Sequence, residues 1–135
     1  MGRNLTLFAD ASAIVAIIGC EPERLDFLQQ IESADACLWS ALACWETVAA
    51  LRSSHGLSIK EAQGRVEHFE QEFGFEMVPI AAAELSIALD AYERFGRGRH
   101  PAQLNFGDCF AYACAKANRA TLLYKGGDFA KTDLA

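Results

Sequence analysis

Short apolar segments alternate with longer amphipathic segments along this 135-residue chain. Apolar runs of about four or five residues bounded by polar or turn-forming residues predict buried strands. One of the runs is weaker, because Pro79 restricts a strand to an end or an edge of a sheet. In chain order, the predicted strands are Leu5–Ala9, Ala36–Trp39, the weak Glu76–Ile80, and Thr121–Tyr124.

Between these runs, apolar residues recur at intervals of three or four, which predicts helices. Ser58 with Glu61 three residues later indicates a capping box, and Pro22 suits a first helical position. The predicted helices are Ser12–Gly19, Glu21–Ser33, Ala41–Gly56, Ile59–Phe73, Ala81–Gly96 and Phe106–Asn118. The alternation predicts an α/β fold with a mainly parallel sheet of four to five strands, flanked by helices on both faces.

The composition fits one globular domain over residues 1–135, with 52% hydrophobic and 22% charged residues. The longest apolar run, Ala11–Gly19, is far shorter than the roughly 20 residues that span a bilayer, and the N-terminus lacks a signal-peptide pattern. We therefore expect a cytoplasmic protein without a membrane span, whose five cysteines are reduced core residues. The net charge of −6 argues against broad adhesion to nucleic acid but permits a local basic surface.

Four carboxylates are placed to meet at one edge of the predicted sheet. Asp10 follows the first strand, and Glu46 lies in the helix after the second. Asp108 lies at a helix start before the fourth strand, and Asp128 follows that strand after two glycines. Ligands of such sheets bind beyond the carboxyl ends of the strands. We therefore expect the four side chains to approach one another.

Carboxylates within about 4 to 6 Å of one another oppose folding unless a cation compensates them. Oxygen ligands without histidine or cysteine favour Mg²⁺ or Mn²⁺ over zinc. Such an ion keeps positions open for phosphate oxygens and activates water for attack on phosphorus. The site therefore predicts hydrolysis of phosphodiester bonds by metal-activated water, without a protein nucleophile.

Each acid also has a structural interpretation. Asp10 can cap the following helix, Asp108 can complement a helix dipole, and Asp128 can be a turn residue. Glu46 is harder to explain in this way, because a charged residue among apolar neighbours is rarely buried unpaired. The combination of the four favours a shared site.

Four segments together resemble PIN domains, and specifically the VapC toxins. The resemblance extends from Leu5 to about Asp133. Its segments are Asp10-Ala-Ser-Ala13, Trp45-Glu-Thr47, Leu104-Asn-Phe-Gly-Asp-Cys-Phe-Ala-Tyr-Ala113 and Leu122-Leu-Tyr-Lys-Gly-Gly-Asp-Phe129. It implies a PIN-like fold and a Mg²⁺- or Mn²⁺-dependent endoribonuclease, the toxin of a type II toxin–antitoxin pair.

The resemblance also implies roles and partners. Asp10, Glu46 and Asp108 match the three principal acidic positions of the family, Asp128 matches a more variable fourth, and Ser12 matches a hydroxyl position near the metal. The implied partners are RNA as substrate, a second copy in a homodimer, and a VapB-type antitoxin whose C-terminal segment covers the active-site groove. Operator DNA would be bound only through the antitoxin.

Supporting residues lie around the Asp108 motif. Asn105 can orient a carboxylate or a metal-bound water, or simply make a hydrogen bond within its loop. The basic segment before it offers guanidinium groups to RNA phosphates, or is a solvated charged loop. Its candidates are Arg94, Arg97 and Arg99. Lys116 and Lys125 are further candidates for phosphate contacts, with surface solubility as the alternative.

Three other functions stay open from the sequence. The chain can be an antitoxin-binding module with degraded catalysis, a non-toxin nuclease in RNA processing, or a phosphatase with Asp10 as nucleophile. The last leaves Glu46 unexplained. The RNA target, the cleavage motif and the number of metal ions are not encoded in any recognisable pattern of residues.

Overall fold

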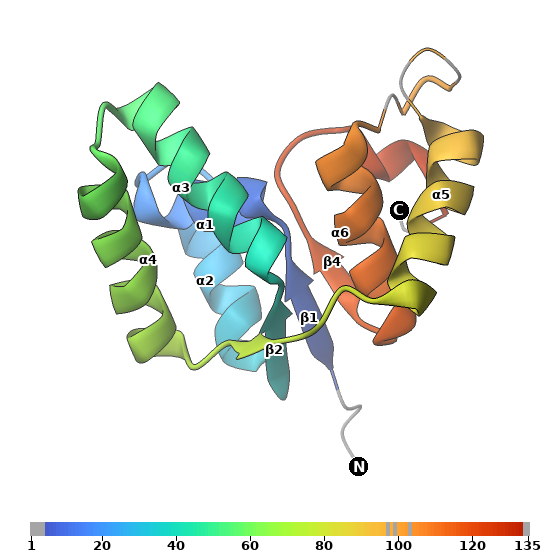
Figure 1. Cartoon of the computed structure of the whole chain (residues 1–135). Helices are drawn as coiled ribbons and strands as arrows, with labels where there is room; N and C mark the ends of the chain where they lie inside the picture. The colour runs from blue at the N-terminus through green and yellow to red at the C-terminus, as the bar shows by residue number, and fades with distance from the viewer. Residues whose placement is uncertain (1–4, 97, 99, 103, 134–135) are drawn as a thin grey trace.

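The computed structural model describes residues 5–96, 98, 100–102 and 104–133. These residues form a sheet of short strands surrounded by helices (Figure 1). The strands are β1 (Thr6–Ala9), β2 (Ala36–Trp39), β3 (Glu76–Met77) and β4 (Thr121–Leu123). The helices are α1 (Ala11–Ile18), α2 (Arg24–Ser33), α3 (Ala41–His55), α4 (Ile59–Phe73), α5 (Ala82–Phe95), α6 (Phe106–Ala117) and the 3₁₀ helix η1 (Phe129–Lys131).

The sheet is parallel throughout, with strand order β3-β2-β1-β4. In the two pairs that β1 forms with its neighbours, Phe8 lies opposite Leu38 on β2 and Leu122 on β4. This confirms the predicted α/β class with a parallel sheet, which has four strands in the described residues. Because β1 is central, the residues that follow it lie in the middle of the sheet's carboxyl edge, where ligands of open α/β sheets bind.

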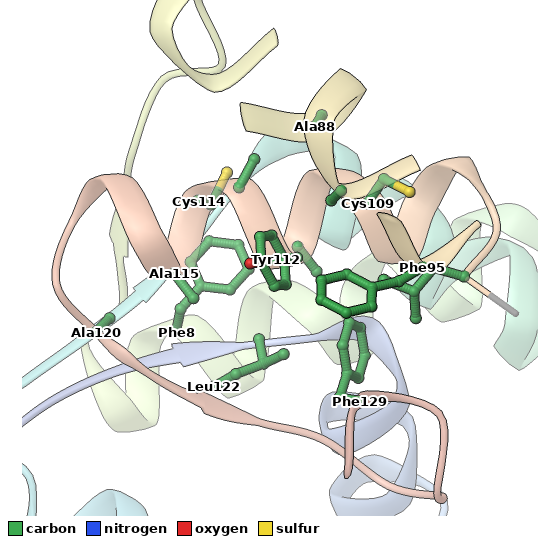
Figure 2. Close-up of a cluster of buried hydrophobic side chains, with 14 of the residues drawn as sticks. Phe8, Ala88, Phe95, Cys109, Tyr112, Cys114, Ala115, Ala120, Leu122 and Phe129 are labelled. Atoms are coloured by element: carbon green, nitrogen blue, oxygen red, sulfur yellow. The ribbon is translucent and has the colours of Figure 1, made fainter. Parts of the chain in front are cut away.

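The sheet separates two hydrophobic cores, because alternate strand residues point to opposite faces. Leu7 and Leu123 belong to the core with α1 to α4, whereas Phe8 and Leu122 belong to the core with α5 and α6. Figure 2 shows the second core, in which Tyr112 of α6 lies among the rings and aliphatic chains of the neighbouring elements. Helices therefore cover both faces, as predicted.

Most helix ends agree with the local signals in the sequence. The Ser58–Glu61 capping box is present, and the Ser40 hydroxyl accepts a hydrogen bond from the Ala43 N–H at 3.1 Å. The expectation for Pro22 was wrong: it lies in a turn, and α2 begins at Arg24. The Glu21 carbonyl accepts the Arg24 N–H instead, which makes residues 21–24 a turn before the helix.

The third strand is shorter than predicted. Only Glu76 and Met77 are in strand conformation, although the Val78 N–H still donates to the Trp39 carbonyl at 2.8 Å. Pro79 has no N–H to continue the ladder, so pairing ends just before it.

Two further expectations concern the chain as a whole. All five cysteines are free, and Cys109 and Cys114 are buried as expected. The core placement was wrong for Cys20, which is exposed, and Cys37 and Cys44 are half-buried. Among the described residues, no helix is long and apolar enough to cross a membrane.

Candidate active site

Asp10 lies directly after the central strand and is the N-cap of α1. Its side chain is almost fully buried, with 7% of its surface exposed. The Oδ2 atom accepts hydrogen bonds from the Ser12 N–H at 3.0 Å and from the Ser12 hydroxyl at 2.6 Å. Burial raises the pKa of Asp10 above its ordinary value, and the Ser12 hydrogen bonds oppose this increase. The cap therefore holds a carboxylate that is poorly solvated.

Ser12 connects this cap to the end of β4. Its Oγ atom donates to Asp10 and accepts the backbone N–H of Lys125 at 2.9 Å. The Asp10 N–H donates to the Leu123 carbonyl at 2.9 Å, which joins the same two segments a second time. The Asp10 carboxylate is thus fixed in direction by two neighbouring strand ends.

Glu46 reaches the site from the second turn of α3. It lies against the start of α6: a Cβ atom added at Gly107 would overlap the Glu46 carboxylate. Burial, followed by the negative charges of Asp10 and Asp108, raises the pKa of Glu46 to about 7. Glycine at position 107 therefore makes room for a carboxylate in a place unfavourable to its charge.

Asp108 lies in the first turn of α6 and forms a capping box with Asn105. The Asn105 Oδ1 atom accepts the Asp108 N–H at 2.9 Å, and the Asp108 Oδ2 atom accepts the Asn105 N–H at 3.1 Å. Asp108 is therefore an acid in the first turn of a helix, as its structural interpretation expected. Asn105 fixes the backbone at the helix start, and that backbone carries Asp108 to the same place as Glu46.

Asp10, Glu46 and Asp108 line one cavity of about 350 Å³, together with Ser12, Glu21 and Lys125. Asp10 lies between β1 and α1, Glu46 lies in α3 and Asp108 lies in α6, so the cavity adjoins the carboxyl end of β1. The negative charges of Asp10 and Asp108 each contribute to the raised pKa of Glu46, so Glu46 lies within electrostatic reach of both. The structure thus brings three of the four predicted acids together.

Asp128 has a different environment. It is exposed at the start of η1 and is not among the described residues that line this cavity. Gly126 before it adopts a φ angle of 101°, a conformation that favours glycine, so the turn predicted there is present. The role of Asp128 as a fourth ligand stays a prediction.

The cavity suits a hard divalent cation in its chemistry. In the part of the chain that the structure describes, no three His, Cys, Asp or Glu side chains form a ready-made metal cluster. Mg²⁺ does not require one, because it is commonly held by one or two carboxylates with water and phosphate oxygens as its other ligands. Three acids at one cavity, of which Asp10 and Glu46 have raised pKa values, therefore fit such an ion.

Arg94 does not line this cavity. Its guanidinium lies 3.3 Å from an Asp90 oxygen and 3.9 Å from an Asp133 oxygen, and it stacks on the Phe95 ring. Asp133 also accepts hydrogen bonds from Tyr112 and Lys116. Arg94 thus takes part in an ion-pair network near the C-terminus. The other two candidates of the basic segment, Arg97 and Arg99, lie outside the described residues.

Glu21 is a member of the site that the sequence did not indicate. It lies in the turn between α1 and α2, lines the cavity, and pairs with Lys125 and with His55 at 3.3 Å. These contacts join residues 34 and 104 positions apart. The Glu-Pro-Glu sequence resembles a helix start, so no local signal distinguishes Glu21.

Comparison with known proteins supports the same family. A family model described as PIN domain matches residues 7–134. A VapC ribonuclease of Rhizobium meliloti is 41% identical over 94% of this chain and 98% of its own length. Another, from Mycobacterium bovis, is 35% identical over 93% of this chain and 94% of its own.

Solved structures share the fold at lower sequence identity. VapC20 of Mycobacterium tuberculosis, a toxin that cleaves the sarcin–ricin loop, has a TM-score of 0.69 at 17% identity and covers 92% of both chains. VapBC2 of Rickettsia felis, bound to a DNA fragment from its promoter, has a TM-score of 0.73 at 14% identity, covering 96% of this chain and 95% of the other. The arrangement of strands and acids and the matches along the chain lead to one conclusion: this protein belongs to the PIN-domain family and, within it, to the VapC group.

Proposed function

We propose that this protein is a Mg²⁺- or Mn²⁺-dependent endoribonuclease and the toxin of a VapBC toxin–antitoxin pair. The observation that carries the proposal is the convergence of Asp10, Glu46 and Asp108 on one cavity. Relatives at 41% and 35% identity over nearly the whole chain are VapC ribonucleases, which supports RNA as the substrate. Burial and then the charges of Asp10 and Asp108 raise the pKa of Glu46, and in this proposal a divalent cation compensates both effects.

The three acids would hold the ion, and the groups around them would fix their positions. A divalent ion supplies Lewis acidity towards a phosphate oxygen and lowers the pKa of water. Ser12 orients Asp10, the capping box of Asn105 positions Asp108, and the small surface of Gly107 admits Glu46. These supports keep the carboxylates in place before RNA binds, so little reorganisation is needed during the reaction.

We propose Asp128 as a fourth, weaker metal ligand. It follows the same strand as Lys125, which lines the cavity, and this supports the proposal. Because it is exposed and does not line the cavity, we expect Asp128→Asn to reduce RNA cleavage less than Asp108→Asn. The measurement is the rate of cleavage of one RNA at saturating Mg²⁺.

An apolar groove beside the site supports the antitoxin as a partner. It lies between α3 and α4 and includes Trp45, with 67% of its surface exposed, and Ile59, with 58%. Trp45 and Ala49 of α3 line the groove, and Glu46 and Ala50 line the cavity, so the groove and the cavity occupy adjoining faces of one helix. We propose that the C-terminal segment of a VapB-type antitoxin binds here and that operator DNA is bound only through that antitoxin. VapBC2 of Rickettsia felis was solved bound to a DNA fragment from its promoter, which supports promoter DNA as a ligand of such a pair.

A second apolar surface supports a homodimer. Leu85, Leu89 and Tyr92 of α5 lie beside Phe106 of α6, and each is roughly half exposed or more. Exposed apolar patches of this kind mark protein interfaces. We propose that a second copy packs on this surface. Leu89→Glu would then convert a dimer to a monomer in light-scattering measurements, whereas an unchanged mass would place the interface elsewhere.

The test of the enzymatic proposal compares wild type with Asp108→Asn, a nearly isosteric change that removes the charge. Asp26→Asn, at an exposed position of α2, is the matched control. Each purified protein is incubated with a structured RNA pool in Mg²⁺ or in EDTA. We expect cleavage that requires Mg²⁺, is retained by the control and falls at least about 100-fold in Asp108→Asn. Equal or absent cleavage in all three proteins would favour an antitoxin-binding module instead.

A further inference from the structure

The candidate cavity carries an excess of negative charge. Four carboxylates line it, those of Asp10, Glu21, Glu46 and Asp108. Among the described lining residues, Lys125 is the one with a cationic side chain. RNA brings further negative charge to this place. A bound divalent ion offsets part of the repulsion at the reacting phosphate, and the neighbouring phosphates of the strand need a cation of their own.

The backbone of Lys125 is fixed relative to the acids. Its N–H donates to the Ser12 hydroxyl at 2.9 Å, and that hydroxyl donates to Asp10 at 2.6 Å. Neither bond uses an atom of the lysine side chain. The start of the side chain therefore has a defined position beside Asp10. A substitution at residue 125 removes the ammonium group and keeps the hydrogen bond of the residue's N–H to Ser12.

The Lys125 ammonium rests on the rim of the cavity. It contacts Glu21, and it lies 3.5 Å from the buried Glu23 Oε1 atom. The lysine side chain is 37% exposed. Ion pairs with this degree of exposure are weak restraints, because water competes for both charges. The ammonium is thus kept near the cavity but is not locked there.

An exposed lysine can also serve a purely structural purpose. The Lys125–Glu21 pair joins the end of β4 to the turn before α2, and Glu21 also contacts His55. If this bridge were the whole role of Lys125, removing either partner would have the same effect. The two interpretations therefore make different predictions for Lys125 and Glu21 variants.

We propose that Lys125 binds a backbone phosphate of the RNA strand beside the reacting phosphate, and that Glu21 holds the ammonium at the rim until RNA enters. The inference rests on the proposed nuclease function. Because a lysine acts as a point charge on phosphate, the contact gives affinity without base specificity. Lys125 is in this sense an RNA-positioning residue.

The experiment measures binding of a fluorescent single-stranded RNA by anisotropy, in an Asp108→Asn background with Mg²⁺ that prevents cleavage. Salt is varied from about 0.05 to 0.3 M. One phosphate contact in a single strand contributes about 0.7 to the slope of log affinity against log salt. Between 1 M and 0.1 M salt, that slope corresponds to a factor of about five in affinity. We expect Lys125→Met to lose about this slope and affinity. Lys125→Arg should restore most of both.

Two controls separate binding from structure. Lys60→Met, at an exposed position of α4, should leave the salt slope and the RNA affinity unchanged. Glu21→Gln removes the ion pair but leaves the ammonium, so it should bind RNA at least as tightly as the parent. An unchanged slope in Lys125→Met, or an equal loss in Glu21→Gln, would overturn the proposal.

Cleavage kinetics with Asp108 intact provide a second readout. Lys125→Met should raise KM about fivefold and leave kcat within about twofold, because the contact is made equally in the bound and transition states. A fall in kcat with unchanged KM would contradict a positioning role. If wild type shows no Mg²⁺-dependent cleavage, the nuclease function fails, and the binding slopes still decide the role of Lys125 separately.

Discussion

Glu46→Gln should stabilise the metal-free protein at alkaline pH. Glu46 ionises with a pKa of about 7 in the folded protein, against an ordinary value of 4.5. Ionisation therefore opposes folding. The stabilising contribution of Glu46 is fully present below about pH 4.5 and is lost as the pH rises through about 7. Glutamine is similar in shape and carries no charge, so the stability of the variant does not fall through ionisation at position 46 as the pH rises.

The magnitude follows from the pKa difference. At about 1.36 kcal/mol per pH unit, the difference between 4.5 and about 7 corresponds to an upper limit of about 3.4 kcal/mol in the free energy of unfolding. Glu46 is partly exposed, and solvent screens its charge. We therefore expect Glu46→Gln to be more stable than wild type by about 1 to 1.5 kcal/mol at pH 8 in EDTA, with little difference at pH 4.5.

The assay is urea unfolding at pH 4.5, 6 and 8, with Glu93→Gln on the exposed face of α5 as control. The pH dependence of the difference between variant and wild type isolates Glu46 from the other acids. Mg²⁺ at pH 8 should reverse the order, because the ion stabilises wild type by mass action and binds the variant more weakly. A variant that is less stable than wild type at pH 8 in EDTA, or a difference independent of pH, would refute the reasoning.

Three further substitutions test separate parts of the structure. Gly107→Ala should displace the Glu46 carboxylate, so we expect the rate of RNA cleavage to fall at least about tenfold. The urea midpoint should change little, because the displaced group is the flexible end of a side chain. A normal cleavage rate would show that the position of Glu46 is not critical. Ser12→Ala removes the hydroxyl that bonds to the Asp10 carboxylate and to the Lys125 N–H. The free energy of unfolding measured in urea should fall by about 1 to 2 kcal/mol, whereas no change would show that water replaces the hydroxyl. Tyr112→Phe removes a 2.6 Å hydrogen bond to Asp133 and should cost about 0.5 to 1.5 kcal/mol with cleavage unchanged; loss of cleavage would connect the C-terminal network to the site.

The fold was largely predictable because its signals are local. The apolar run before Asp10 and the Ser58–Glu61 capping box each depend on residues a few positions apart. The differences also have local causes. Pro79 ends β3 early, and the turn at residues 21–24 delays α2, where the sequence pattern fits a helix start equally well.

The site was predictable in outline and not in detail. That Asp10, Glu46 and Asp108 share one cavity follows from the positions of strand ends in a parallel sheet. The contact of Glu46 with Gly107 depends on how α3 packs against α6, and the ion pair of Glu21 with Lys125 joins segments 104 residues apart. Contacts of this kind have no sequence signature. Asp128, which follows a strand as Asp10 does, is exposed because its glycine turn leads into η1.

The central claim is that Asp10, Glu46 and Asp108 form a divalent-metal site. The most direct measurement is a crystal structure of the protein soaked in Mn²⁺, with data collected for the anomalous signal of manganese. The account predicts an anomalous peak in the cavity within about 2.0 to 2.4 Å of oxygens from at least two of the three acids. Occupied manganese elsewhere, with none at these carboxylates, would contradict it.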